Sequence, residues 1–387
     1  MNTFNNKSAP ALIFIPDISG YTKFVNSTEI LHAKHILEEL LEVLMDANEI
    51  DMELSEIEGD ALLFYRKGEP PTVSEMVDQV QKMYTKFHEY LKQLDTHRIC
   101  SCGACSSANN LEIKFVTHYG EVAENHVKDR FVLFGKEVIV AHRLLKNEVP
   151  SNSYSIFSND LIDACDTWEK LQEVACSDVV EMEEQYDFGK ANYSYIELES
   201  LKNQLAEPKI EDYNIKGSTE KLFRIEQIIE APIDLTFNVL SDYSIRHEYS
   251  DGLIDSDLVN HKITQNGSTH RCVINKNESD PLFVAHDYSF NKNNITFIES
   301  SQKQNFTSIY SLTAINKQQT RIIMTAFTKP NFFKVLIFNL FFKKKVIRSA
   351  KQTFINLNEH CKKMVAKNLQ HSSQIILPDE VIKFEEV

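Results

Sequence analysis

The sequence of 387 residues has no segment typical of export or of membrane insertion. Residues Met1 to Pro10 are polar and lack the charged segment followed by an apolar one that forms a secretory signal. The longest apolar run near the C-terminus, Val335 to Phe342, is interrupted by Asn339 and is far too short to cross a bilayer. We therefore expect a cytoplasmic protein.

Cysteine and positive charge are also limited. The seven cysteines, three of them clustered, do not resemble the disulfide framework of a secreted domain, so we expect reduced thiols. The formal net charge of -15 argues against a general nucleic-acid binder, which needs a basic face. The sequence also contains no internal repeat and no low-complexity tract.

What remains is an ordinary globular composition, 42% hydrophobic and 25% charged, in a chain long enough for two domains. A polar stretch containing Pro208 and Gly217 reads as a linker. We therefore predict a first domain at 8–202, a linker at 203–218, a second domain at 219–367 and a loosely held tail at 368–387.

The first domain alternates strand and helix patterns. They predict a strand at 11–15, a helix at 27–48, a hairpin at 52–57 and 61–65, a helix at 73–94, strands at 111–118 and 131–134, a helix at 136–146, and strands at 153–157, 179–183 and 193–198. This β-α-β-β-α-β order is that of a ferredoxin-like α+β sandwich.

Two aspartates stand at the edges of these predicted strands. Asp17 follows the first apolar strand directly after Pro16, and Asp60 lies in the Gly-Asp turn of the hairpin. If the two strands are neighbours, the carboxylates meet at one point. Such a pair is suited to a hard divalent cation that carries a nucleoside triphosphate.

The residues around these aspartates carry a resemblance to a known family. Phe14-Ile15-Pro16-Asp17-Ile18-Ser19-Gly20-Tyr21-Thr22, followed by Gly59-Asp60 in a hairpin, resembles the catalytic domain of class III nucleotidyl cyclases. His118-Tyr119-Gly120 is similar to the His-x-Gly turn of that family, and Gly135 to Leu144 to its Gly-x-x-Val-Asn-x-Ala-x-Arg-Leu helix. The resemblance covers roughly residues 8 to 200.

The resemblance implies a role for several residues. Asp17 and Asp60 would hold Mg²⁺ or Mn²⁺, and the backbone of Ile18, Ser19, Gly20, Tyr21 and Thr22 would cradle the phosphates. Arg143 matches the arginine that stabilises the transition state. Glu56 matches a base-reading position and favours guanine, although a lone glutamate on a strand is more often simply solvated. The family's active sites form at a homodimer interface, so a homodimer is expected.

Two positions depart from the family pattern. The asparagine that orients the ribose is replaced by Ile139, which cannot form hydrogen bonds, and a base-reading position is the apolar Val132. Because orientation supplies much of this chemistry, we expect binding without efficient turnover.

A cysteine cluster, Cys100-x-Cys102-x-x-Cys105, follows His97 in a predicted loop. Thiolates at this spacing can converge on Zn²⁺, with His97 or the more distant His118 as fourth ligand. The alternative is three reduced thiols in a loop of small residues. An iron–sulfur cluster would usually need a fourth thiolate.

The second domain reads as a strand at 222–230, a helix at 233–240 opened by Pro232, several alternating strands and a long helix at about 331–366. Its opening, Phe223 to Pro232 and then Phe237 to Tyr243, resembles the START-like (SRPBCC) superfamily of lipid carriers and polyketide-cyclase-like proteins. The helix-grip fold of that superfamily implies an apolar cavity for a lipid or other hydrophobic molecule. Candidates for the cavity wall are Phe283, Phe290, Phe297 and Phe327, and candidate polar groups are His247 and His286.

An aromatic segment, Phe332 to Phe342, runs directly into Lys343-Lys344-Lys345, with Arg348 and Lys351 beyond. This composition suits a peripheral membrane contact or the mouth of a lipid cavity. The alternative is a helix that faces the core and has a solvated basic side.

The two domains together predict a sensor or signalling regulator that couples a hydrophobic ligand to a nucleotide. Two alternatives stay open: an active guanylate-type cyclase gated by the second domain, and a lipid-binding or transfer protein whose first domain serves dimerisation.

Overall fold

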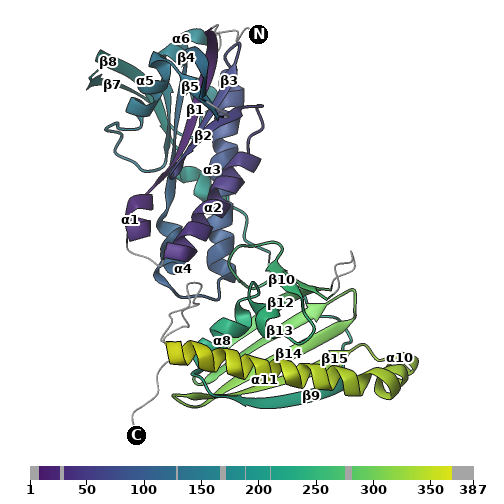
Figure 1. Cartoon of the computed structure of the whole chain (residues 1–387). Coiled ribbons are helices and arrows are strands. Elements are labelled where there is room, and N and C mark those ends of the chain that lie inside the picture. The colour runs from purple at the N-terminus through teal and green to yellow at the C-terminus, as the bar shows by residue number, and fades with distance from the viewer. Residues whose placement is uncertain are drawn as a thin grey trace, which may run out of the picture. The chain divides into compact units, whose positions relative to one another are not determined.

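The computed structural model describes residues 8–26, 30–127, 130–165, 171–187, 189–209, 211–274 and 281–367. The chain divides into two compact units. Unit 1 comprises Met1–Ser27, Leu37–Gln93 and Ser107–Pro208, and unit 2 comprises Thr28–Ile36, Leu94–Ser106 and Lys209–Val387. The short segments 28–36 and 94–106, which the sequence-based boundaries include in the first domain, thus group with unit 2. Helices and strands are mixed in both units, as predicted (Figure 1).

Unit 1 contains a sheet in the order β2-β3-β1-β4-β6-β8-β7, with β5 paired to the far end of β4. Its neighbours are antiparallel except for the parallel pair β4 and β6. The bounds are β1 (Ala9–Ser19), β2 (Glu53–Glu58), β3 (Ala61–Lys67), β4 (Glu112–Val127), β5 (Arg130–Phe134), β6 (Tyr154–Ser158), β7 (Val179–Tyr186) and β8 (Gly189–Glu197).

Strand β1 lies in the middle of this sheet, and residues Ala11 to Ile15 are buried on both of its faces. This explains why the strand reads as a continuous apolar run rather than as an alternating pattern. Ile13 and its same-face neighbours pack with Val140 and Leu144 of a helix, and Phe14 packs with Phe64 and Phe115 on the opposite face. The pairing fixes the register that places Asp17 near the C-terminal end of this central strand, beside Ala61 of β3.

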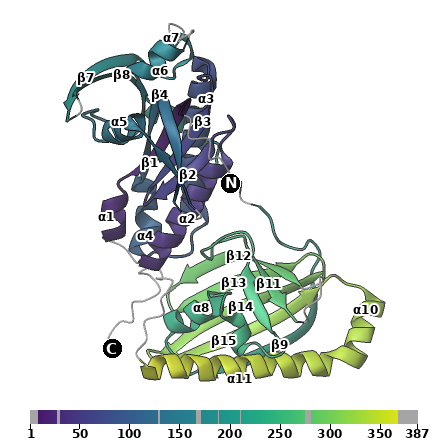
Figure 2. The same ribbon diagram turned by 45° about the horizontal axis from the view of Figure 1, so that its top comes forward.

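Helices cover both faces of the sheet of unit 1 (Figures 1 and 2). The described helices up to residue 204 are α1 (Tyr21–Asn26), α2 (Ile30–Asp46), α3 (Val73–His97), α4 (Gly103–Ser107), α5 (Lys136–Leu144), α6 (Asn159–Ala164) and α7 (Leu171–Val174), with 3-10 turns η1 (Ala108–Asn110) and η3 (Glu199–Gln204). Of these, α4 groups almost entirely with unit 2. The single helix predicted at 27–48 is therefore represented by α2, with the separate short helix α1 before it. The predicted cysteine loop contains α4.

Unit 2 contains a seven-stranded antiparallel sheet in the order β10-β11-β12-β13-β14-β15-β9. Its strands are β9 (Glu220–Ile229), β10 (Asp255–Leu258), β11 (Ser268–Val273), β12 (Leu282–Asn291), β13 (Asn294–Ser301), β14 (Phe306–Asn316) and β15 (Gln319–Thr328). The helices are α8 (Ile233–Ser241), α9 (Arg246–Tyr249), α10 (Phe332–Ile337), the π-helical turn η4 (Phe338–Phe342) and α11 (Lys343–Lys367).

The long helix α11 lies along this sheet and contacts β9, α8 and α9 (Figure 2). Phe354, Leu357 and Cys361 form the buried stripe on α11. The long helix predicted at about 331–366 is present, because α10, η4 and α11 follow one another without a gap from Phe332 to Lys367, with the π-helical turn within it. Within the described part of the chain, no helix is long and apolar enough to span a membrane.

Candidate functional site

The two aspartates of unit 1 come together where the neighbouring strands β1 and β3 meet the hairpin turn, as the sequence predicts. Asp17 lies near the end of β1, in register with Ala61 of β3, directly after Asp60. The backbone N–H of Ile18 donates to the carbonyl of Asp60 over 3.2 Å. Burial raises the pKa of the half-buried Asp60 carboxyl, and the nearby charge of Asp17 raises it further. The pair thus has the electrostatics of two carboxylates that share one site.

A lysine also belongs to this site, and the sequence analysis did not identify it. Lys114 of β4 lies in register with Asp17, and its Nζ donates to the Asp17 carboxylate over 3.1 Å. The same Nζ donates to the carbonyl of Leu145 over 3.2 Å. Both ion-paired side chains are only 19% exposed. The ammonium group therefore supplies a fixed positive charge beside the carboxylates, where a metal-binding pair would hold a cation.

The turn after β1 is shaped by Gly20, whose φ of +88° lies in the left-handed region that favours glycine. Its carbonyl accepts the N–H of Phe24 over 3.0 Å, which begins α1. Tyr21 is near the carboxylate pair, since burial and then the charge of Asp60 raise the pKa of its hydroxyl. The predicted phosphate-binding segment therefore adjoins the aspartates.

The other residues carried over from the cyclase resemblance lie on β2, β5 and α5. Glu56 is half-buried on β2, next to an irregularity in its pairing with β3. Arg143 is on α5 and forms an exposed ion pair with Asp187 over 2.8 Å. Ile139 of α5 is 58% exposed, and Val132 of β5 is half-buried.

His118 is fully buried on β4 of unit 1. Its Nδ1 contacts the hydroxyl of Ser158 at 2.8 Å, and its Nε2 contacts the carboxylate of Glu137 at 2.9 Å. A Cβ at Gly120 would lie 2.6 Å from Cγ of Glu137, so a glycine is needed for this approach. The His-x-Gly pattern thus has a structural reason in this chain.

The three clustered cysteines are buried in unit 2 and surround a histidine that the sequence analysis did not identify. Nδ1 of His32, in the first turn of α2, lies 3.7 Å from Sγ of Cys100, 3.2 Å from Sγ of Cys102 and 3.4 Å from Sγ of Cys105. The four ligand atoms all lie within 4.8 Å of one another. The group contains His32 in the place for which the sequence suggested His97 or His118.

Unit 2 also buries a salt bridge that the sequence analysis missed. Arg246 of α9 donates to both carboxylate oxygens of Glu299 on β13 and to the hydroxyl of Tyr310 on β14. Nε2 of His270 lies 3.0 Å from the same guanidinium, and the His270 ring stacks on Tyr243 at 3.9 Å between centroids. Arginine and glutamate are seldom buried unless paired, and no local spacing in the sequence connects residues on four separate elements.

The predicted cavity residues of unit 2 differ in their surroundings. Phe297 is fully buried and stacks on Tyr310 with 4.7 Å between centroids. Phe290 meets Phe237 edge-on at 5.5 Å. Phe283 and Phe327 are half-buried. Nε2 of the buried His286 contacts the Ser300 hydroxyl, whereas Nδ1 of the partly exposed His247 contacts Ser256.

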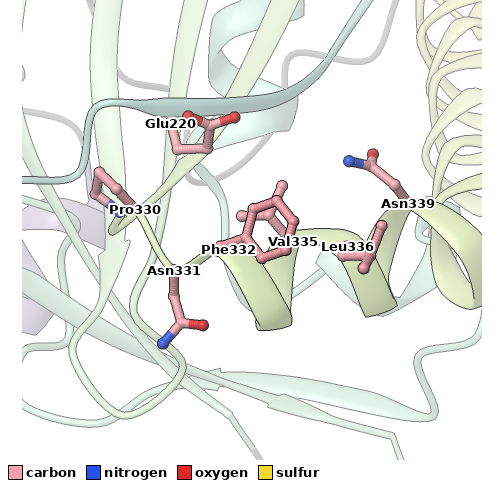
Figure 3. Close-up of a pocket in the computed structure, with 7 residues that line it drawn as sticks. All are labelled: Glu220, Pro330, Asn331, Phe332, Val335, Leu336 and Asn339. Carbon is pink, nitrogen blue, oxygen red and sulfur yellow. The ribbon is translucent and has the colours of Figure 1, made fainter.

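The aromatic segment before α11 faces solvent. Phe332, Phe333, Leu340 and Phe341 are each more than two-thirds exposed, and neither α10 nor η4 contains a buried residue. The alternative of a helix that faces the core is therefore wrong for 332–342. An open pocket of about 420 Å³ lies beside α10. Glu220, Pro330, Asn331, Phe332, Val335, Leu336 and Asn339 line it (Figure 3).

By sequence, part of the chain is similar to a family of unknown function and to an uncharacterized protein. Residues 37–154 match a family described as protein of unknown function (DUF2652). An uncharacterized protein of Mycobacterium tuberculosis is 40% identical over 127 residues, which cover 33% of this chain and 58% of that protein. The chain thus spans somewhat more than half the length of this curated relative.

Comparison by structure finds adenylyl and guanylyl cyclase domains over about half of the chain. A bacterial light-regulated adenylyl cyclase is 17% identical, covers 51% of this chain and 98% of its own, and has a TM-score of 0.36. The Zhui aromatase/cyclase from Streptomyces is 11% identical and covers 37% of this chain and 94% of its own, with a TM-score of 0.28.

Proposed function

We propose that unit 1 binds a nucleoside triphosphate together with Mg²⁺ or Mn²⁺ at Asp17 and Asp60 and turns it over poorly, acting as a regulatory domain. The observation that carries this proposal is the convergence of both carboxylates beside the glycine turn at Gly20. The carboxylates would ligand the metal, and the backbone after Asp17 would contact the phosphates. The metal would supply charge neutralisation for the phosphate oxygens.

Two features favour binding without efficient cyclisation. The ammonium of Lys114 is already paired with Asp17, so it partly neutralises the site and competes with a second cation. Ile139 offers no hydrogen bond to a ribose, and Arg143 is engaged by Asp187 on the exposed side of α5. Positioning of the reacting hydroxyl would therefore be weak.

The test is to measure binding and turnover on the full chain. Each common nucleoside triphosphate is titrated with Mg²⁺ by calorimetry, and cyclic product and pyrophosphate are assayed with Mn²⁺. We expect metal-dependent binding that Asp17→Asn and Asp60→Asn each weaken by more than about tenfold. Asp46→Asn, an exposed carboxylate on α2, is the matched control and is expected to bind normally.

Two results would change the proposal. Efficient formation of a cyclic nucleotide that disappears in Asp60→Asn would establish an active cyclase instead, with Glu56→Gln testing a guanylate preference. Absence of binding for every nucleotide, with either metal, would leave the domain as a dimerisation element and would refute the proposed site.

We propose that unit 1 associates as a homodimer. Ile57, Phe134 and Ile139 are apolar and each more than half exposed on this unit, and the strands β2 and β5 that carry the first two are in contact, so these side chains would supply an apolar interface. Sedimentation of wild type and of Phe134→Asp tests this. A monomeric wild type over the micromolar range would refute it.

Unit 2, in our proposal, is a START-like domain that binds a hydrophobic molecule. An antiparallel sheet against which a long C-terminal helix packs is the arrangement that supports this assignment. The open pocket beside α10 has a size suited to a small ligand and an apolar wall formed by Phe332, Val335 and Leu336 (Figure 3). Native mass spectrometry of the full chain is expected to show a bound lipid or apolar metabolite. A ligand-free mass, with no uptake of a fatty acid probe, would argue against it.

The exposed segment 332–342 would bring this pocket to an anionic membrane surface. Its aromatic side chains can enter the interface, and Lys343, Lys344, Lys345 and Arg348 follow directly, whereas the whole chain is strongly acidic. Each basic residue near an anionic surface contributes about 1 kcal/mol. Flotation with phosphatidylcholine vesicles, with and without phosphatidylserine, tests this contact.

We expect binding only to the anionic vesicles, lost in Phe332→Ser/Phe341→Ser and weakened by salt. Val259→Ser, another exposed apolar residue of unit 2, serves as the control. Equal binding by the double variant would refute the membrane contact. Dimerisation of unit 2 through this segment without lipid would make it a protein interface instead.

A further inference from the structure

We propose that His32, Cys100, Cys102 and Cys105 form a structural zinc site in unit 2. The site is independent of the nucleotide site proposed for unit 1. His32 lies in the first turn of α2. Cys100 and Cys102 lie in the segment between α3 and α4, and Cys105 lies in α4. All four belong to unit 2 and all are buried.

The distances fit a single tetrahedral metal. With Zn–S of about 2.3 Å and Zn–N of about 2.0 Å, the corners of a regular tetrahedron lie about 3.5 to 3.8 Å apart. The three distances from Nδ1 of His32 to the sulfur atoms are 3.7, 3.2 and 3.4 Å. All four ligand atoms lie within 4.8 Å of one another, so they form one compact group around a common point.

The donor set is that of a closed zinc site. Three thiolates and one imidazole satisfy a tetrahedral Zn²⁺ completely and leave no position for substrate, which is typical of structural rather than catalytic zinc. Softer thiolate ligands also select against Mg²⁺ and Ca²⁺, which prefer oxygen. The ion would therefore differ in kind from the one proposed at Asp17 and Asp60.

Backbone amides are placed to support the sulfur charges. The N–H of Cys102 donates to Sγ of Cys100, and the N–H of Cys105 donates to Sγ of Cys102, each over 3.4 Å. Three thiolates on one dication leave a net negative charge, and such donors offset it in a buried site. The small residues Gly103 and Ala104 let the chain turn tightly between these cysteines.

The site would hold segments that are distant in sequence. His32 and Cys100 are separated by 68 positions, so the ion would close a long loop between the start of α2 and the segment after α3. Closure of such a loop restricts the unfolded chain and stabilises the folded one. The helix α4 has only five residues, too few to be stable in isolation, so the metal would help to hold it in place.

The experiment measures metal content of the full chain, purified without a metal-affinity step. Plasma mass spectrometry is expected to find about one zinc per chain. Cys102→Ser, Cys105→Ser and His32→Gln should each lose most of it. His97→Gln, which is outside the group of four ligand atoms, and Cys272→Ser, a buried cysteine elsewhere in unit 2, should keep it.

Two further measurements distinguish loss of a zinc ligand from simple misfolding of a variant. His32→Cys preserves a four-ligand thiolate site and should retain zinc. Exchange of zinc for cobalt(II) in wild type should give the intense visible absorption of tetrahedral thiolate coordination, and this spectrum should change in His32→Cys. Absence of zinc from wild type with no uptake on titration, or unchanged zinc content in the His32→Gln/Cys102→Ser double variant, would overturn the proposal.

Discussion

Arg246 and Glu299 show what a single buried pair contributes in this protein. Both side chains are almost completely buried, and the guanidinium is shared among Glu299, His270 and Tyr310. Taking two charges out of water is costly, so the pair stabilises unit 2 little compared with an apolar pair of the same volume. Removing one partner is different, because the other charge is left buried and unpaired.

Arg246→Met is therefore expected to destabilise unit 2 by roughly 3–5 kcal/mol, and the double variant Arg246→Met/Glu299→Leu is expected to recover much of this loss. Native-state hydrogen exchange in β13 and β14 measures the effect. The control is Arg271→Met, which removes an exposed ion pair with Asp257 and should cost less than about 1 kcal/mol. A double variant as unstable as the single one would show that the pair itself is stabilising.

His270 makes stability depend on pH. Burial lowers the pKa of His270 to about 3, and Arg246 opposes its protonation although Glu299 favours it. Since the guanidinium can only donate, Nε2 of His270 must accept, and this requires the neutral ring. The unfolded chain binds this proton near pH 6.5 and the folded chain does not, so stability is lost as the pH falls below that value.

Lowering the pH from 7 to about 5 should reduce the free energy of unfolding by about 2 kcal/mol through this histidine alone. Urea denaturation at the two pH values measures the change. His270→Gln can still accept from Arg246 but cannot titrate, so the loss should shrink by that amount. His88 of unit 1, whose pKa burial lowers to about 3, remains in both proteins and contributes equally. An unchanged pH dependence in His270→Gln would contradict this assignment.

At the level of elements, the hairpin β2–β3 places Asp60 through the conformation of one glycine. Gly59 has a φ of +67°, and a Cβ there would meet no atom within 4 Å. Gly59→Ala should therefore cost about 1 kcal/mol from backbone strain alone, and Gly59→Asn less, because asparagine tolerates this region. Hydrogen exchange in β2 and β3 measures both. Equal protection in wild type and Gly59→Ala would show that the turn does not require the left-handed conformation.

The elements that could be predicted are those with a strong local signal. Apolar periodicity and turn residues gave the hairpin, α3 and α5 close to their observed bounds. The first strand was found but predicted too short, at 11–15, because β1 extends to Ser19 beyond its apolar run. The long helix predicted at about 331–366 is also present, as α10, η4 and α11 in succession. What the sequence left open was the burial of its first part, because an apolar segment that packs and one that stays exposed have similar composition.

The residues of the two candidate sites also differ in whether a local sequence signal reveals them. Asp17 and Asp60 could be brought together from the sequence because each ends a strand and the two strands pair. Lys114 and His32 could not be found, since β4 reaches Asp17 and α2 reaches the cysteines only through the tertiary fold. His97 was favoured by proximity in sequence, whereas the group of four ligand atoms in the structure contains His32 instead.

The whole chain divides into two compact units, so we expect the stability of each unit to depend mainly on its own contacts. All four proposed zinc ligands group with unit 2, whereas the carboxylate pair groups with unit 1. A change at one site should therefore first alter the unit to which it belongs. This expectation depends on the zinc site and can be tested without any substitution.

Removal of zinc with a chelator should increase deuterium uptake first in residues 94–106, where the three cysteines lose their common ligand. The centre of β1, where Ala11 to Ile15 are fully buried in unit 1, should keep its protection under the same conditions. Hydrogen exchange followed by mass spectrometry resolves both segments in one experiment, and re-addition of zinc should restore the first. Simultaneous loss of protection in both would mean that the cysteine site stabilises the whole chain. Unchanged uptake in 94–106 after complete removal of zinc would mean that packing alone holds this segment.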